Sequence, residues 1–164
     1  MNPWYVAAFL GREPALSAPQ RRTLLLVCVA CVFGTFEIAF LNAALPQVAR
    51  DLDMSTADTG FYLGAIRAGG FGTLFILPVA DRLGRWPVLS AAVVALGLGS
   101  LVTALSPSAP AFVAAQVVTF AVALAIQALA VVLVVEQLSA RSHGAAVGML
   151  MVLGGVGHGV AALL

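Results

Sequence analysis

The stretch Asp81-Arg82-Leu83-Gly84-Arg85 decides the fold of this chain, because it is a short charged segment between two long apolar runs. These runs cover about residues 58–80 and 87–106, and each is long enough to cross a bilayer as a helix. So short a segment leaves no room for a domain, and the two helices must turn back on each other at one membrane face. Because it contains two Arg, the positive-inside rule places this turn in the cytoplasm.

The composition gives the class of protein. Hydrophobic residues make up 62% of the chain and charged residues 9%, whereas soluble domains carry about 25% charged residues. The net charge of +1 and the lack of a basic cluster argue against a nucleic-acid partner. We therefore predict a multi-pass integral membrane protein of the cell (inner) membrane, with the lipid bilayer as its surroundings.

The apolar runs are continuous, which predicts helices, since the strands of a membrane barrel would alternate polar and apolar residues. We expect an all-α antiparallel bundle in which short connections make consecutive helices neighbours. The predicted transmembrane domain covers residues 23–164 and contains five spans, at about 23–46, 58–80, 87–106, 111–135 and 145–164.

The distribution of Arg predicts the orientation. The face that contains the charged turn would hold Arg12, Arg21, Arg22, Arg82, Arg85 and Arg141. The opposite face would hold Arg50 alone. This asymmetry predicts that the N-terminal segment, residues 1–22, is cytoplasmic.

Charged residues inside the spans are costly and are therefore candidates for function. At 1.5 Å per residue, Glu37 and Arg67 both lie roughly 21–23 Å from the cytoplasmic face, and His158 reaches a similar height. We expect Glu37 and Arg67 to form an ion pair, direct or bridged by water or substrate. Three titratable groups at one depth suggest a polar cavity that handles substrate or protons. The alternatives are a structural lock between two helices and, for His158, a hydrogen-bonded packing residue.

Gln127 is a further candidate for this cavity. It lies roughly 13 Å above the cytoplasmic face, where it could line the cavity or hydrogen-bond across helices. Gln116 falls near the outer end of its span and is less informative.

The sequence predicts no enzyme, metal site or cofactor. No nucleophile–base pair or His-x-x-x-His pattern lies at one depth. Cys28 and Cys31 form a CxxC inside the first apolar run, which favours packing residues over a redox or zinc pair. The acidic loop at 51–58 has neither the Gly nor the Glu of an EF-hand; Ser55 and Asp58 instead predict a capping box.

Glycines spaced by four residues predict close helix packing. They occur at Gly60–Gly64, Gly144–Gly148 and Gly155–Gly159, with further glycines beside them. Such spacing lets helix backbones approach or slide past each other. Either simple packing or a rocking interface fits this pattern.

The charged turn resembles the motif G-x-x-x-D-R-x-G-R-[RK] between helices two and three of the major facilitator superfamily. Four positions match, and these are Asp81, Arg82, Gly84 and Arg85. Leu77 stands where the first Gly is expected and Trp86 where the last basic residue is expected. The stretch 42–46, which reads NAALP, and Glu136 at the end of the fourth span are also similar to that family.

The resemblance implies secondary active transport of a small organic solute by alternating access, with Asp81, Arg82, Gly84, Arg85 and Glu136 as a cytoplasmic gate. In this family the turn latches the inner face, so Arg85 would pair with Asp81 and also reach Glu136. The stretch 154–159 contains no Pro, whereas drug antiporters of the family usually carry Gly-Pro in helix five. This favours a proton-coupled symporter over a drug/proton antiporter.

Members of this family have about twelve helices in two halves, with the substrate site between the halves. This chain resembles about five helices of the N-terminal half. We therefore expect a piece of a longer protein, a subunit that needs a partner, or a truncated membrane protein without transport activity of its own.

Overall fold

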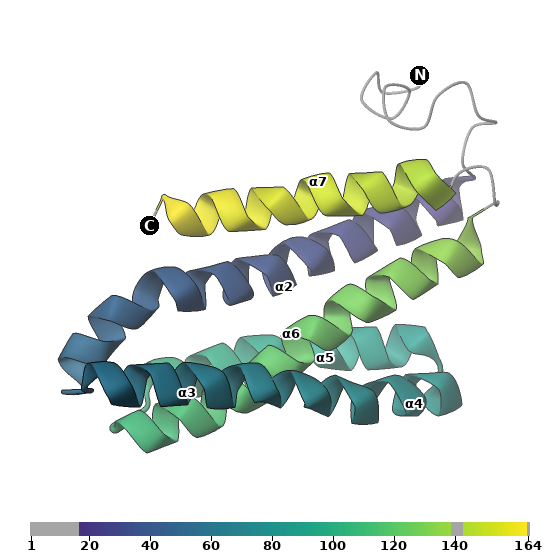
Figure 1. The fold of residues 1–164 in the computed structure, drawn as a ribbon. Helices are drawn as coiled ribbons and strands as arrows, with labels where there is room; N and C mark the ends of the chain where they lie inside the picture. The colour runs from purple at the N-terminus through teal and green to yellow at the C-terminus, as the bar shows by residue number, and fades with distance from the viewer. Residues whose placement is uncertain (1–16, 139–142, 164) are drawn as a thin grey trace.

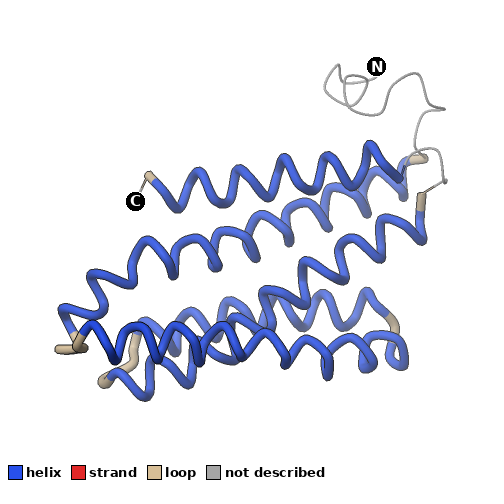
Figure 2. The backbone as a smooth tube through the Cα atoms, in the orientation of Figure 1, coloured by secondary structure: helices blue, strands red, loops and turns tan. Residues whose placement is uncertain are grey.

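The computed structural model describes residues 17–138 and 143–163, and all regular structure in these residues is helical (Figure 2). Among them are five helical segments long and apolar enough to cross a membrane, which confirms the predicted fold class. Arg12, Arg141 and most of the predicted N-terminal segment lie outside the described residues. The spans alternate in direction, so the charged turn lies at the same end of the bundle as the start of the first span (Figure 1).

The helices begin and end within a few residues of the expected spans, except that the first is longer at both ends. They are α2 (Ala18–Asp51), α3 (Thr56–Ala68), the 3-10 helix η1 (Gly69–Gly72), α4 (Thr73–Leu83), α5 (Arg85–Ala104), α6 (Ala109–Gln137) and α7 (His143–Ala162). The second span comprises α3, η1 and α4 in succession. Helix α2 continues past Pro46, where the expected span ended.

Local sequence explains where the helices begin. The backbone N–H of Asp58 donates to Ser55 Oγ at 3.1 Å, and the N–H of Ser55 donates to Asp58 Oδ2 at 3.3 Å. This is the predicted capping box, and it starts α3. Ser17 and Gln20 form a second capping box at the start of α2. Gly84 separates α4 from α5 with a φ of 93°, a backbone conformation that favours glycine.

The second span changes its helical form at Gly69–Gly72, where a close approach to α6 takes place. A Cβ on Gly69 would lie 2.5 Å from the carbonyl oxygen of Val117, so only glycine lets the two backbones come this near. The sequence pattern of the second span predicted a single helix and gave no sign of this change of helix type.

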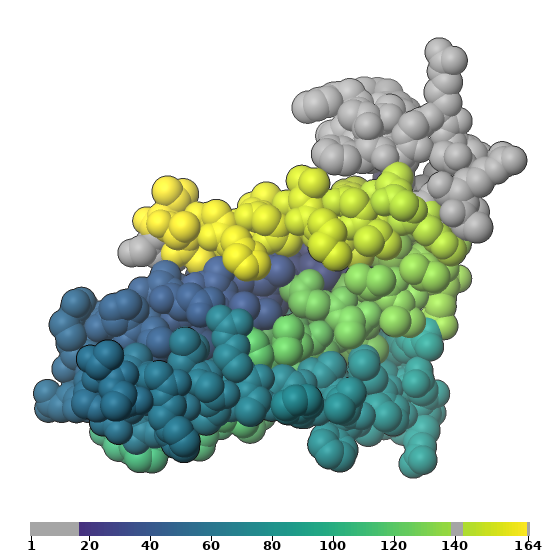
Figure 3. Space-filling model, viewed as in Figure 1, coloured from purple at the N-terminus to yellow at the C-terminus, as the bar shows by residue number. Residues whose placement is uncertain are grey.

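Helix α6 lies at the centre of the bundle. It carries apolar residues on every side, and α2, α3, η1, α4 and α5 all pack on it. Helix α2 packs mainly along α7 and α6 rather than along α3 (Figure 1). The expectation that consecutive helices are antiparallel neighbours is therefore wrong for α2 and α3, because α6 takes the central place. Figure 3 shows α7 lying along α2, and these two helices run in the same direction.

Close packing between α2 and α7 depends on glycines other than those in the predicted pairs. A Cβ on Gly157 would lie 2.5 Å from the carbonyl oxygen of Val32 and 2.9 Å from the backbone nitrogen of Phe36. By contrast, the three predicted pairs Gly60–Gly64, Gly144–Gly148 and Gly155–Gly159 face open space, with no described atom within 4 Å of an added Cβ. The predicted pairs are thus not the sites of close packing within this chain.

Candidate functional site

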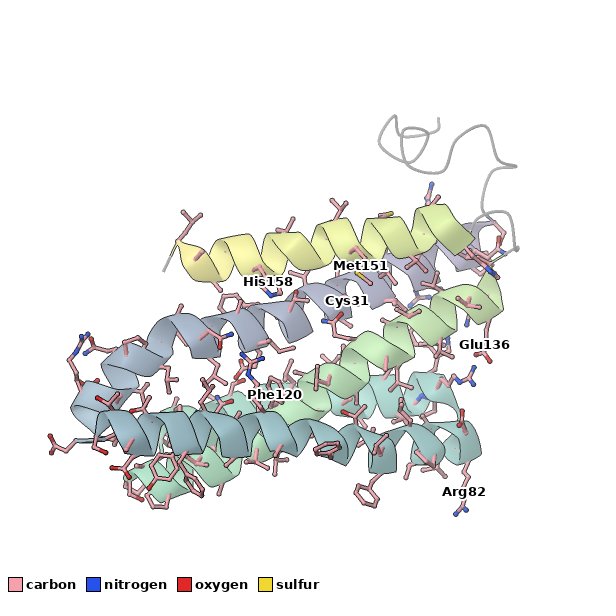
Figure 4. The ribbon with its side chains drawn as sticks, viewed as in Figure 1. Cys31, Arg82, Phe120, Glu136, Met151 and His158 are labelled. Carbon is pink, nitrogen blue, oxygen red and sulfur yellow. The ribbon has the colours of Figure 1, made fainter. Side chains whose placement is uncertain are left out.

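The charged turn forms both ion pairs that were expected of Arg85. Its Nη2 lies 3.1 Å from Asp81 Oδ1, and its Nη1 forms an ion pair with Glu136 Oε1. Figure 4 shows Glu136 and Arg82 at the same end of the bundle, with the side chain of Arg82 directed away from it. The guanidinium thus joins the end of α4, the start of α5 and the end of α6. Arg suits this position, since its planar fork can contact two carboxylates.

These ion pairs are at the surface. They fix the relative position of the helix ends and contribute little to the free energy of unfolding. The side chain of Arg85 is 26% exposed, whereas those of Glu136 and Asp81 are 50% and 63% exposed. Exposed pairs of this kind contribute about 0–1 kcal/mol. Gln20 at the start of α2 donates from Nε2 to the carbonyl oxygen of Gln137 at 3.0 Å, which ties a further helix to this end.

A second polar group surrounds Glu37, which is half-buried on α2. Ser100 Oγ on α5 lies 2.9 Å from Glu37 Oε2 and 3.0 Å from the carbonyl oxygen of Leu96. Gln116 Nε2 on α6 lies 3.4 Å from Glu37 Oε1, and the Gln116 residue is only 4% exposed. These side chains line a groove of about 270 Å³ between α2, α5 and α6, which we call the acidic groove.

A third polar group surrounds Arg67 on α3. Arg67 Nη2 donates to Asn42 Oδ1 at 2.9 Å, and the guanidinium carbon lies 5.5 Å from the centre of the Phe120 ring. Phe120 is in the middle of the bundle in Figure 4. Asn42 Nδ2 in turn donates to the carbonyl oxygen of Ile38 at 2.8 Å, which leaves Asn42 Oδ1 facing the guanidinium. Arg67 and Asn42 are both exposed, so further ligands can reach the guanidinium.

A direct ion pair between Glu37 and Arg67, one of the two predicted forms, is not formed; both ion pairs found among the described residues belong to Arg85. Arg67 instead meets Asn42, which follows Glu37 by five positions on α2. Five positions correspond to about 140° around the helix and about 7.5 Å along it. Equal height above one membrane face was therefore not sufficient to predict an ion pair. Glu37 projects from one side of α2, whereas Arg67 contacts Asn42 on another side of that helix.

His158 and Gln127 join neither group. His158 is exposed on α7, and its Nδ1 lies 3.3 Å from the carbonyl oxygen of Gly154 in the same helix (Figure 4). Gln127 Nε2 donates to the carbonyl oxygen of Cys31 at 3.1 Å, so it hydrogen-bonds from α6 to α2. The predicted common cavity is thus replaced by separate environments for Glu37, Arg67 and His158.

Four polar residues of the acidic groove were missed or set aside from the sequence, and these are Ser100, Thr103, Ser106 and Gln116. Ser and Thr are common packing residues in membrane helices, so the three hydroxyls carried no distinct signal. Gln116 did carry one, since a buried amide in an apolar span needs a partner. Within the described residues there is no cluster of His, Cys, Asp or Glu that could hold a metal, and Cys28 and Cys31 are free and buried.

Comparison with known proteins gives a distant relative. No family model and no solved structure matches the chain. The 4-hydroxybenzoate transporter PcaK of Pseudomonas aeruginosa is 33% identical over 116 residues, which is 70% of this chain and 25% of that protein. The match thus spans about a quarter of the length of this relative, which is a transporter and not an enzyme. The described residues contain five helices long enough to span a membrane, and this chain is a distant and partial homologue of a transporter of the major facilitator superfamily.

Proposed function

We propose that this chain takes part in secondary active transport of a small organic acid, driven by protons through alternating access. The observation that carries the proposal is Arg67, an exposed guanidinium that has no carboxylate partner among the described residues. Arg binds carboxylates with two parallel hydrogen bonds, so it suits an anionic solute. The substrate named for the relative, 4-hydroxybenzoate, is an aromatic carboxylate and supports this class of solute.

Asn42 and Phe120 would prepare Arg67 for this task. The hydrogen bond from Nη2 to Asn42 uses one of the five guanidinium donors and holds the group in place. The Phe120 ring, 5.5 Å from the guanidinium carbon, covers one face of the cation. The remaining donors stay available for a carboxylate, so the site is fixed before the solute arrives and little entropy is lost on binding.

Glu37 would bind and release the proton. As a carboxylate it accepts hydrogen bonds from Ser100 and Gln116. After protonation the carboxyl group could donate a hydrogen bond to Ser100 Oγ. The Ser100 hydroxyl would then donate its own hydrogen bond to the carbonyl oxygen of Leu96, 3.0 Å away. The same surroundings therefore satisfy both protonation states, as a residue that exchanges protons during transport requires.

The cluster of Asp81, Arg85 and Glu136 would serve as the gate at the cytoplasmic end. Its ion pairs hold the ends of α4, α5 and α6 together. Because exposed ion pairs are weak, they can break and re-form as the inner face opens and closes. This assignment includes the predicted orientation, with the charged turn and the start of α2 in the cytoplasm.

The test uses the purified protein in liposomes, with radiolabelled 4-hydroxybenzoate and an imposed pH gradient. The Glu37→Gln variant should lose accumulation driven by the gradient but keep the exchange of internal for external solute. The Arg67→Lys variant should bind the solute more weakly by about tenfold, since an ammonium cannot reproduce the bidentate contact. Asp53→Asn, which removes a carboxylate from the exposed loop after α2, is the matched control and should behave as the unaltered protein.

Normal gradient-driven accumulation by the Glu37→Gln variant would refute the proposal that Glu37 binds and releases the transported proton. If the unaltered protein shows no uptake at all, the chain is a membrane protein without transport activity of its own. Uptake of cationic drugs against a proton gradient, without uptake of organic acids, would favour a drug/proton antiporter instead.

A further inference from the structure

We infer that the acidic groove is a hydrated path that carries protons to Glu37, separate from the path by which an anionic solute reaches Arg67. This inference rests on the proposed function and adds to it a physical separation of the two transported species. Helix α2 would be the divider, with a proton path on one side and a solute path on another.

The acidic groove follows a single stripe of α2. The lining residues of this helix are Glu37, Phe40, Leu41, Ala44, Val48 and Asp51, which recur at helical spacing. Carboxylates thus occur at both ends of the stripe, with Asp51 beside the α2–α3 loop and Glu37 about 21 Å away along the helix. The volume of about 270 Å³ is enough for several water molecules, each of which needs about 30 Å³.

Hydroxyl groups along α5 give this groove a polar wall. Ser100 and Thr103 line it from α5, about 4.5 Å of helix rise apart, and Ser106, which follows the end of α5, lines it as well. Single water molecules can bridge groups at such intervals. They would complete a hydrogen-bonded chain from Ser106, in the loop after α5, through Thr103 and Ser100 to Glu37. No basic side chain is among the residues that line the groove.

Thr103 differs from the other hydroxyl residues that line the groove. The hydroxyls of Ser100, Ser106 and Thr119 each lie within hydrogen-bond distance of the carbonyl oxygen four residues earlier in the chain. Thr103 Oγ1 is buried and has no hydrogen-bond partner among the described residues. A buried hydroxyl normally has a partner, so this one can gain a water partner only when the helices around it move apart.

A second groove follows a different stripe of α2 and has the opposite charge. We call it the basic groove: its volume is about 340 Å³, and Asn42, Pro46 and Arg50 of α2 line it together with Thr56 and Thr59 of α3. Its charged side chain is Arg50, and Asn42 leads to Arg67 through their hydrogen bond. An anion would be attracted to this groove and repelled from the one that contains Glu37 and Asp51.

A cluster of buried apolar side chains reaches the acidic groove at Leu41 and the Arg67 guanidinium at Phe120, and would separate the water of one groove from that of the other. Leu41 lines the acidic groove and is 4% exposed, while Ile66, the residue before Arg67, is fully buried. Both belong to one buried apolar cluster with Phe120, whose ring lies under the Arg67 guanidinium. Protons on the Glu37 side would therefore not reach the solute site directly through water at this depth.

Thiol labelling in the membrane tests this separation without requiring transport. Cys28 and Cys31 are first replaced by Ala, and a single Cys is placed at Ala44 in the acidic groove or at Ala49 in the basic groove. Each is treated with a small cationic and a small anionic methanethiosulfonate reagent. We expect Ala44→Cys to react about tenfold faster with the cation, and Ala49→Cys to show the opposite preference.

Val94→Cys, on an exposed part of α5 that does not line either groove, is the control for a lipid-facing position and should react slowly with both reagents. If Ala44→Cys reacts no faster than Val94→Cys, the groove is not hydrated and the inference is overturned. Equal charge preference at Ala44 and Ala49 would overturn the separation of the two paths.

Transport measurements on variants that fill each groove then test whether the acidic groove carries protons to Glu37. Ala44→Leu should abolish most proton-driven accumulation and leave solute exchange intact, whereas Ala49→Leu should impair exchange. Parallel loss of both activities in Ala44→Leu would contradict separate paths. A failure of the proposed function is distinguishable, because it would show as absent uptake by the unaltered protein while the labelling pattern persists.

Discussion

Replacement of Gly157 by Ala gives a sharp test of how α7 packs on α2. An added Cβ would lie 2.5 Å from the carbonyl oxygen of Val32 and 2.9 Å from the backbone nitrogen of Phe36. Ordinary contact begins at about 3.4 Å, so α7 must move away from α2 by roughly 0.9 Å. Both atoms belong to a helix backbone and cannot turn aside as a flexible side chain would.

The expected magnitude follows from two opposing effects. Overpacking of this kind costs about 1–3 kcal/mol, and Ala in place of Gly within a helix gains about 0.5–1 kcal/mol. Gly159→Ala is the matched control, since it obtains the same gain on the same helix with no described atom within 4 Å of its Cβ. Gly157→Ala should therefore be less stable than Gly159→Ala by about 1–3 kcal/mol, because the gain cancels in the comparison.

Thermal unfolding of the two variants in detergent, followed by circular dichroism or by a thiol-reactive dye, measures this difference. At about 2–4 °C per kcal/mol for a chain of this size, the midpoint of Gly157→Ala should lie roughly 2–12 °C below that of Gly159→Ala. Equal midpoints would refute the argument, since they would show that α7 does not approach α2 through Gly157.

Two further substitutions and one labelling experiment follow from the structure. Ser55→Ala removes the capping box at the start of α3 and should lower the free energy of unfolding by about 0.5–2 kcal/mol, which chemical denaturation can measure. Glu136→Gln should change stability by less than about 1 kcal/mol but should weaken the closure held by Arg85, so its solute uptake rate should change far more than its melting midpoint. Cys28 and Cys31, which are 3% and 1% exposed, should react with a maleimide only when the chain unfolds, and fast labelling of the folded protein would contradict their burial.

The sequence was a good guide wherever the cause is local or comes from the bilayer. Continuous apolar runs predicted the helices, since no other open structure satisfies its backbone hydrogen bonds in lipid. Ser55 and Asp58 predicted the start of α3, because the capping box involves residues only three positions apart. The charged turn led to the ion pairs of Arg85, which join residues at one end of the bundle.

The sequence was a poor guide to which sides of the helices face one another. It predicted that Glu37 and Arg67 would pair, but height along a helix says nothing of rotation about its axis. It placed Gly154, Gly155, Gly157 and Gly159 together in a stretch suited to close packing, but it did not say which of them meets a neighbour, and in the structure Gly157 makes the close contact. Both points concern the choice of packing partner, which spacing within one helix cannot specify.

The sequence by itself thus determined that this chain crosses a membrane in helices, that a capping box starts α3, and which turn joins α4 to α5. These features depend on hydrophobicity, capping and chain length, which are properties of single segments. Only the tertiary structure decided that α6 is central, that α2 lies along α7, and that Glu37 contacts Ser100 whereas Arg67 contacts Asn42. Apolar helices in lipid have no hydrophobic preference for one neighbour, so shape and polar contacts between distant residues select the arrangement.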